Sequence, residues 1–145
     1  MVIKINISQE GKTYRLEAES NVLEGKSIGD KFNGKILKKE LEDYEFEIRG
    51  GSDFAGFPMS KEIEGIGLKK VLLSKGWGMH SKPKGLKKKK PKLQKGLRLR
   101  KTVRGKTITE KTSQLNLNVI KKGSKPLAEI FPTENKAETQ EQPTE

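Results

Sequence analysis

Apolar and polar residues alternate along several short stretches of this chain, as they do in β-strands with one buried face. Ile3, Ile5 and Ile7 are separated by polar residues, and a second alternating stretch over residues 14–18 follows the turn residue Gly11. Two alternating runs joined by a turn that contains glycine are typical of a β-hairpin. The sequence therefore predicts a hairpin at the start of the chain.

Four later stretches also have the composition of strands. They cover residues 44–48, 71–73, 98–104 and 115–120. The first alternates most regularly, whereas Val71, Leu72 and Leu73 form a continuous apolar run that suits a more deeply buried strand. Glycines between residues 22 and 37 separate short apolar pieces, which favours short strands joined by tight turns.

These patterns predict a mainly β fold. No stretch repeats apolar residues at helical spacing over three turns, so a helix bundle has little support. A small domain can hardly cover the exposed edges of an open sheet, and closure removes those edges. We therefore expect a small β-barrel-like domain or a strongly curved sheet.

The distribution of charge changes this picture of an ordinary small domain. The net charge is +12, yet residues 65–109 alone contain sixteen Lys and Arg residues and no Asp or Glu. A block of one sign opposes compaction by self-repulsion, so its natural partner is a polyanion. We expect nucleic acid, although a solvated charged loop or a nuclear localisation tract would also be basic.

Composition also predicts the domain organisation and excludes several classes of site. Only 31% of residues are apolar, which favours one β-rich domain over residues 1–127 together with less ordered segments. We expect a long, mobile basic loop at 78–96, and a disordered acidic tail at 128–145. There is no cysteine and a single histidine, so neither a metal site nor a cofactor is expected.

Two further classes of function find no support in the sequence. The acidic residues do not form a pair of general acid and general base, so we expect no enzymatic activity. The first residues lack the continuous apolar stretch of a signal peptide or a membrane span, which predicts a soluble, cytoplasmic protein.

The basic block supplies the candidate RNA-binding residues. Lysine neutralises phosphates as a mobile point charge, whereas the planar arginine side chain suits bidentate contacts. Trp77 is either a base-stacking residue or a plug at the edge of the core. The candidates are Lys75, Trp77, His80, Lys82, Lys84, Lys87, Lys88, Lys89, Lys90, Lys92, Lys95, Arg98, Arg100, Lys101, Arg104 and Lys106.

A glycine-rich segment at 50–59 follows the regular strand at 44–48. Adjacent glycines allow a close approach of the backbone to another chain, and an aspartate can close a local turn. We favour an architectural role for this ordered loop over direct RNA contact, although glycine-rich backbones can hold phosphates. Its key residues are Gly50, Gly51, Asp53, Gly56, Phe57 and Pro58.

Several motifs together resemble the small-subunit ribosomal protein S6e family of archaea and eukaryotes. They are IRGGSDFAGFPM at 48–59, VLLSKGWGMH at 71–80, and LRLRKTVRG at 97–105 followed by LNLNVIKKG at 115–123. The resemblance implies a structural component of the small ribosomal subunit with a β-barrel-like domain. Its expected partners are small-subunit rRNA and neighbouring ribosomal proteins, with no small-molecule substrate and a monomeric state before assembly.

The end of the sequence favours one branch of that family. Eukaryotic relatives continue into a long basic helix with a regulated serine cluster, whereas this chain ends in an acidic tail, so it resembles the short archaeal form. Two rival functions remain open at this point. One is a non-ribosomal RNA-binding protein or RNA chaperone, and the other is a peripheral protein on anionic membranes, which would require an amphipathic stretch that the sequence lacks.

Overall fold

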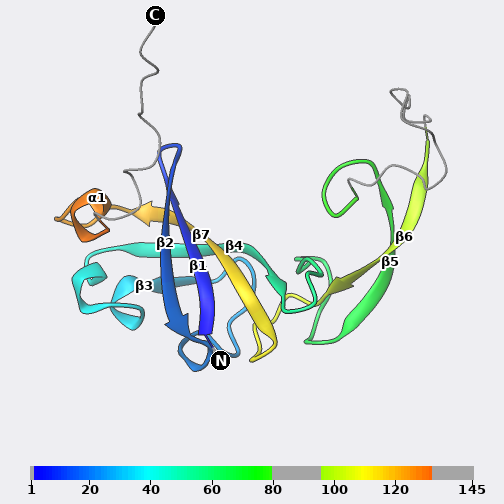
Figure 1. Ribbon diagram of the computed structural model, residues 1–145, viewed down its shortest axis with the longest axis horizontal. Helices are drawn as coiled ribbons and strands as arrows, with labels where there is room; N and C mark the ends of the chain where they lie inside the picture. Colours follow the sequence, from blue (N-terminus) through cyan, green and yellow to red (C-terminus); the bar gives the residue numbers. More distant parts are fainter. Residues whose placement is uncertain (1, 80–95, 132–145) are drawn as a thin grey trace, which may run out of the picture.

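The computed structural model describes residues 2–79 and 96–131 of the chain (Figure 1). Its strands are β1 (Val2–Gln9), β2 (Lys12–Glu19), β3 (Lys31–Asn33), β4 (Glu45–Asp53), β5 (Leu68–Ser74), β6 (Arg98–Arg104) and β7 (Thr112–Lys121). The helical elements are one short α-helix, α1 (Leu127–Ile130), and 3-10 turns at Ser20–Val22, Gly34–Ile36 and Lys39–Leu41. The prediction of a mainly β fold is thus confirmed.

Five of the strands form one mixed sheet in the order β2-β1-β7-β4-β3. The hairpin of β1 and β2 is in register from Val2 opposite Glu19 to Gln9 opposite Lys12, as the alternation predicts. β7 inserts between β1 and β4, and it pairs with β1 in the parallel sense and with β4 in the antiparallel sense. The first and last strands of the domain therefore meet at the centre of the sheet.

One face of this sheet carries the core. The alternating residues Ile5, Ile7, Phe46, Ile48 and Leu115 have no exposed surface. Side chains from the connecting segments cover them, among them Leu23, Leu41, Tyr44, Ile108 and Leu127. Burying this much apolar surface supplies most of the stability of a domain of this size. We call the five-stranded sheet and the segments packed on it the sheet body.

The chain after β7 closes one side of the core. Leu127 of α1 is buried, and the Tyr44 hydroxyl donates a 2.5 Å hydrogen bond to the carbonyl oxygen of Lys125. The rings of Tyr14 and Phe131 lie 6.1 Å apart. Residues 128–131, where the sequence analysis begins the acidic tail, thus end α1 and contact the core.

The expected barrel is not found. Among the residues that the structure describes, β2 and β3 are the two ends of the sheet and no hydrogen bonds join them. The edges are instead protected because β3 has three residues and because β2 presents charged side chains outward, both of which discourage pairing with another strand. The 3-10 turns and α1, rather than closure, cover the core.

β5 and β6 form a separate antiparallel ribbon that extends away from the sheet body (Figure 1). Their register runs from Leu68 opposite Arg104 to Ser74 opposite Arg98. The prediction of a deeply buried strand at 71–73 is wrong in its burial, because Leu72 is 53% exposed and its two neighbours are half-buried. Among residues 2–79 and 96–131, no further strand joins this two-stranded sheet, so its strands are less buried than those of the sheet body. We call β5 and β6 the ribbon.

Two other predictions meet the structure only in part. The segment 22–37 contains the single strand β3. Of its other apolar residues, Val22 and Ile36 lie in 3-10 turns, and the rest lie in bends or turns. Apart from Gly78, Met79 and Gly96, the predicted loop at 78–96 lies outside the described residues, as does the tail from residue 132 onward.

Candidate nucleic-acid interface

The pairing of β5 with β6 places positive charge on one face of the ribbon. Directly opposed residues in an antiparallel pair point to the same side, and successive residues alternate. Leu72 lies opposite Arg100 and Ser74 opposite Arg98, so both arginines share a face with Lys70, which lies opposite Thr102. All three cations are exposed. We call Lys70, Arg98 and Arg100 the cationic face.

The opposite face of the ribbon is more apolar. Val71, Leu73 and Leu99 project from it and are half-buried, while Val103 at its base is fully buried. Lys69 and Lys101 share this face near the same end. The ribbon is therefore amphipathic, with its apolar side turned partly toward the protein and its cationic face open to solvent.

Apart from Arg104 at its base, the cations of the ribbon have no carboxylate partners among the described residues. The ion pairs of the described chain do not include Lys69, Lys70, Lys75, Arg98, Arg100 or Lys101. Lys106, by contrast, lies 3.1 Å from Glu64. The ribbon thus carries charge that no carboxylate of the described residues neutralises.

Charges on the sheet body are arranged differently. Lys35 and Glu42 are 2.6 Å apart, and this hydrogen-bonded contact raises the pKa of Lys35. Lys122 donates a hydrogen bond to Glu10, which lowers the pKa of that carboxyl group. Pairs of this kind leave little net field for a distant polyanion. The cationic face of the ribbon differs from these paired charges, because none of its three cations has a described carboxylate partner.

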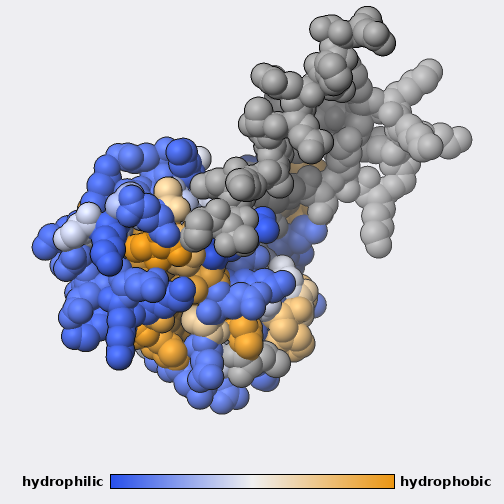
Figure 2. All heavy atoms as spheres, turned by 60° about the vertical axis from the view of Figure 1, so that its left-hand side comes forward, coloured by the Kyte–Doolittle hydropathy of each residue, from blue (hydrophilic) through white to orange (hydrophobic). Residues whose placement is uncertain are grey.

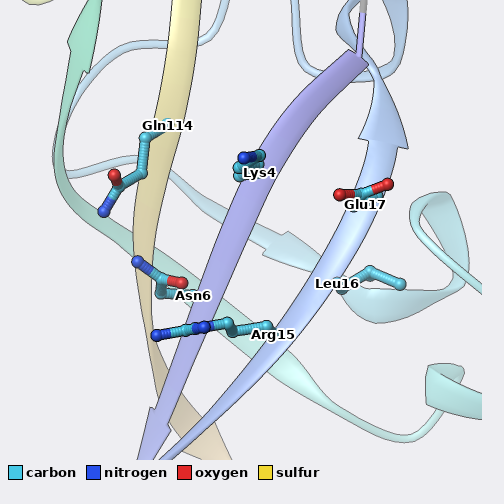
Figure 3. A pocket seen from close by; sticks show the side chains of 6 residues that line it. All are labelled: Lys4, Asn6, Arg15, Leu16, Glu17 and Gln114. Carbon is cyan, nitrogen blue, oxygen red and sulfur yellow. The ribbon is translucent and has the colours of Figure 1, made fainter. Parts of the chain in front are cut away.

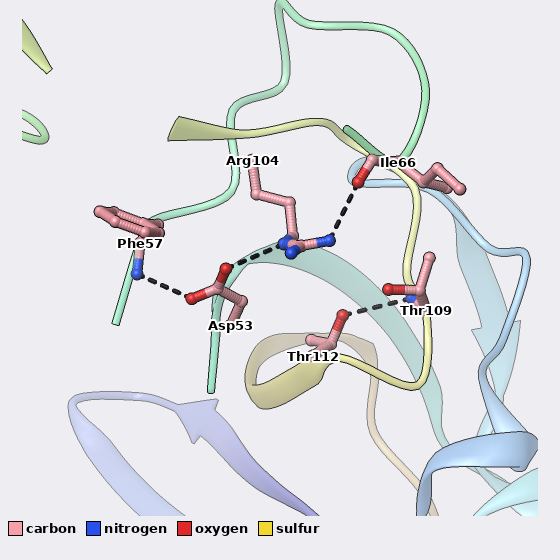
Figure 4. Close-up of polar contacts among 6 residues, drawn as sticks. All are labelled: Asp53, Phe57, Ile66, Arg104, Thr109 and Thr112. Atoms are coloured by element: carbon pink, nitrogen blue, oxygen red, sulfur yellow. Dashed lines mark hydrogen bonds and ion pairs between the residues drawn. The ribbon is translucent and has the colours of Figure 1, made fainter. Parts of the chain in front are cut away.

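Arg104, at the base of β6, points inward. Its Nε donates a 3.0 Å hydrogen bond to Oδ2 of Asp53, and its Nη1 donates a 2.9 Å bond to the carbonyl oxygen of Ile66 (Figure 4). The side chains of Arg104 and Asp53 are 7% and 1% exposed. The other carboxylate oxygen of Asp53 accepts a 2.9 Å bond from the backbone N–H of Phe57. This buried pair attaches the ribbon to β4.

The glycine-rich segment forms the end of β4 and the turn that follows it. Gly51 passes so close to β7 that a Cβ atom there would collide with the carbonyl oxygen of Gln114 and lie 2.9 Å from Leu115 Cδ2. Asp53 and Phe57 close the turn through backbone bonds, and the carbonyl oxygen of Pro58 accepts a 2.9 Å bond from the Arg104 N–H. These contacts are all made within the protein.

The glycines of this segment differ in what surrounds them. Gly50 has open space where a side chain would stand, and Gly56 has a φ of 84°, which favours glycine in the turn. Phe57 and Pro58 are half-buried. The segment thus connects the end of β4 to the base of β6 by contacts over short distances.

Trp77 lies on the surface beside β5. It stands in a tight turn in which Gly76 and Met79 exchange backbone hydrogen bonds of 3.3 and 3.2 Å. Met79 is 2% exposed and holds this turn against the protein, whereas Trp77 is 53% exposed. His80 and the lysines at 82, 84, 87–90, 92 and 95 lie outside the described residues.

The outer face of the sheet body is polar but not cationic. A shallow depression on it has Lys4, Asn6 and Arg15 on β1 and β2, with Gln114 on β7 (Figure 3). Glu17 lies opposite Lys4 in the hairpin and offsets part of this positive charge. Elsewhere on the sheet body, apolar atoms gather into patches enclosed by hydrophilic surface (Figure 2). Neither feature matches the ribbon in charge.

Two cations of the ribbon were missed by the sequence analysis. Lys69 and Lys70 directly precede the apolar run at 71–73 inside the acid-free block. Their position in that block was the available signal, and the register that pairs Lys70 with Thr102 adds it to the cationic face. Within residues 2–79 and 96–131, no group of three acidic or histidine side chains could hold a metal ion.

One structural observation concerns whether the chain could span a membrane. In the part of the chain that the structure describes, no helix has the length and apolar character needed to span a bilayer.

Comparison with known proteins identifies the family of the chain. The model of the family "Ribosomal protein S6e" matches residues 1–92 and 90–132. Small ribosomal subunit protein eS6 of Methanosphaera stadtmanae is 42% identical over 134 residues, or 90% of this chain and 93% of that relative. The eS6 protein of Methanocaldococcus jannaschii is 43% identical over 132 residues, 91% of this chain and 90% of the relative. The chain belongs to the ribosomal protein S6e family.

Proposed function

We propose that this protein is a structural constituent of the small ribosomal subunit and that its ribbon holds small-subunit rRNA through the cationic face. The family is structural and non-enzymatic, and its archaeal relatives carry the name of a small-subunit protein. One observation carries the assignment of the surface. Lys70, Arg98 and Arg100 share one exposed face, and no described carboxylate neutralises them.

The chemistry of the three side chains suits a phosphate backbone. Guanidinium groups donate in-plane pairs of hydrogen bonds to phosphate oxygens, and an ammonium group adds a compact charge. Alternation along β6 brings Arg98 and Arg100 to the same side, with roughly 7 Å between their backbone positions. Such a face recognises the sugar–phosphate backbone rather than the base sequence.

In this proposal the buried pair of Arg104 and Asp53 does not contact RNA, but it supports the cationic face. A two-stranded ribbon is marginally stable in water by itself. Because Arg104 is bonded to Asp53 and to the carbonyl oxygen of Ile66, the base of the ribbon has a fixed position on the sheet body. A preorganised surface loses less conformational entropy when it binds.

The proposal includes further candidate RNA-binding residues, which only their positive charge supports. Lys75, Lys101 and the cations between residues 80 and 95 belong to the same acid-free block. Lys106 lies beside Glu64, so we expect it to contribute less to RNA binding. We further propose that the protein is monomeric before assembly, works in the cytoplasmic ribosome and contacts neighbouring ribosomal proteins there.

A charge-neutralising variant tests the cationic face. The full-length chain and its Lys70→Gln/Arg98→Gln/Arg100→Gln variant are compared in filter binding to purified archaeal small-subunit rRNA across a salt series. Each phosphate contact contributes a slope of about 0.7 to 0.9 in log affinity against log salt. The variant is therefore expected to lose about 2 to 3 from that slope and roughly 100-fold in affinity at about 0.15 M salt.

A matched variant on the sheet body controls for net charge. Lys12, Arg15 and Lys31 are exposed residues of β2 and β3, and their replacement by glutamine removes the same charge. Equal losses in both triple variants would contradict a localised interface. Absence of the protein from small subunits washed at high salt would contradict the structural role.

A further inference from the structure

A groove with an apolar floor runs beside β5, next to the cationic face. Its volume is about 480 Å³, within the range of sites that take small organic groups. Met59 and Ile63 are buried in its floor, Val71 and Leu73 belong to its β5 side, and Trp77 lies at its rim. With 53% of its surface exposed among the described residues, Trp77 offers its ring for contact at the edge of this apolar hollow.

The position of Trp77 is set by the backbone rather than by packing of its own ring. The turn that holds it requires Gly76 at φ 139° and Gly78 at φ 71°, conformations that favour glycine. Gly78 also lies against Leu73, since a Cβ atom there would be 3.0 Å from Leu73 Cδ1. Buried Met79 fastens the end of the turn. The indole is thus presented at the groove by a constrained segment.

The charges around the groove are mostly positive. Arg49, Lys61 and Lys75 line it, and Glu62 is the one acidic residue among the described lining residues. Arg49 lies 3.3 Å from Glu47, whereas Lys61 and Lys75 are in no ion pair with a described residue. An apolar hollow surrounded by cations fits an aromatic group that carries phosphate.

We infer that this groove binds an unpaired base of the rRNA, stacked on Trp77, with the adjoining phosphates next to Lys61 and Lys75. The inference rests on the proposed function and adds to it a site for the base itself. Single-stranded RNA is commonly recognised by stacking of splayed-out bases on aromatic side chains. Charge decides between occupants, because an apolar side chain of a neighbouring protein would gain nothing from the lysines.

The intrinsic fluorescence of the full-length chain tests the site directly. Trp77 is the only tryptophan in the sequence, so tryptophan emission reports on this residue alone. Titration with a single-stranded oligouridylate of about 12 nucleotides is expected to quench the emission, since one OB-type site spans about 4 to 16 nucleotides. A duplex RNA hairpin of equal charge binds the cationic face but is expected to leave the emission unchanged.

A Trp77→Leu variant measures what the stacked base contributes. Its affinity for the single-stranded RNA is expected to fall about 5- to 150-fold, because base stacking on an aromatic residue contributes about 1 to 3 kcal/mol. The slope against salt should stay as in the parent chain, whereas Lys61→Gln should lower it by about 0.7. Phe54→Leu is the matched control, since Phe54 is an exposed aromatic residue outside the groove.

The outcomes separate this inference from the proposed function. Quenching by the oligouridylate and a loss of affinity in Trp77→Leu that Phe54→Leu does not share support the groove. Unchanged emission with both RNAs, or equal affinities for Trp77→Leu and the parent, would overturn it. If the Lys70, Arg98 and Arg100 variant still loses its salt slope in that case, the cationic face stands without the groove.

Discussion

The sheet body and the ribbon of this protein follow opposite rules. The sheet body buries alternating isoleucines, leucines and aromatic residues and pairs several of its charges, as in Lys35 with Glu42. The ribbon has two strands, leaves Leu68 and Leu72 about half exposed, and carries cations without described partners. The sheet body is therefore stabilised by its own interior, whereas the ribbon leaves apolar and cationic side chains exposed, as the proposed RNA contact requires.

The difference separates the part of the chain that supplies stability from the part to which we assign RNA binding. An interior with fully buried side chains tolerates little change. A two-stranded ribbon contributes little to stability by itself, yet it can present charge in a fixed spacing once its base is attached. Attachment depends on Arg104 and Asp53, which lie on the boundary of the two regions.

The largest expected effect concerns that boundary. Asp53→Ala leaves the Arg104 guanidinium buried without its carboxylate, and removing one partner of a buried pair costs about 3 to 5 kcal/mol of unfolding free energy. Urea denaturation of the free chain measures this loss. An Asp53→Leu/Arg104→Met double variant should recover part of it, because the unpaired charge is gone. Equal destabilisation of the two variants would show that the side chains are not coupled.

A second comparison sets one leucine of each region against the other. Leu117 in β7 is 1% exposed, so Leu117→Ala is expected to lower the unfolding free energy by about 3 kcal/mol through lost burial and a cavity. Leu72 in β5 is 53% exposed, and Leu72→Ala should change the unfolding free energy by no more than about 0.5 kcal/mol. Thermal or urea unfolding monitored by circular dichroism measures the unfolding free energy of both variants. Similar losses would mean that the ribbon belongs to the same packed core.

The smallest effect lies within a single strand, at two adjacent glycines. Gly51→Ala places a methyl group against the carbonyl oxygen of Gln114, and overpacking of this kind costs about 1 to 3 kcal/mol. Gly50→Ala meets no atom within 4 Å and should be close to neutral. The difference in urea midpoint between the two variants is the measurement. Two neutral substitutions would contradict the close approach of β4 and β7.

Local patterns predicted the elements better than their arrangement. The alternation of Ile3, Ile5 and Ile7 is sufficient for the hairpin because both strands and their turn are adjacent in sequence. The parallel pairing of β1 with β7 joins residues more than 100 positions apart, as in Ile5 with Leu115. Periodicity identifies the buried face of a strand but does not identify its neighbour, so a barrel was expected where an open sheet occurs.

Charge patterns had a similar limit at the proposed interface. The acid-free block predicted the region, since charge sums need no knowledge of the fold. It did not distinguish Arg104 from Arg98 and Arg100, because all three arginines follow the same alternation along β6 and lie on the same face of the ribbon. The difference comes from Asp53, which is 51 positions away in sequence and reaches only the base of the strand.

The place of β7 has a consequence for biosynthesis. It is the last strand to be made and yet lies between β1 and β4, so a growing polypeptide holds two incomplete half-sheets with open edges until β7 emerges. Translation proceeds at about 5 to 20 residues per second, and roughly 70 residues separate the ends of β4 and β7, so this stage lasts roughly 3 to 14 s. Those seconds are when the nascent protein is most exposed to aggregation and has most need of a chaperone.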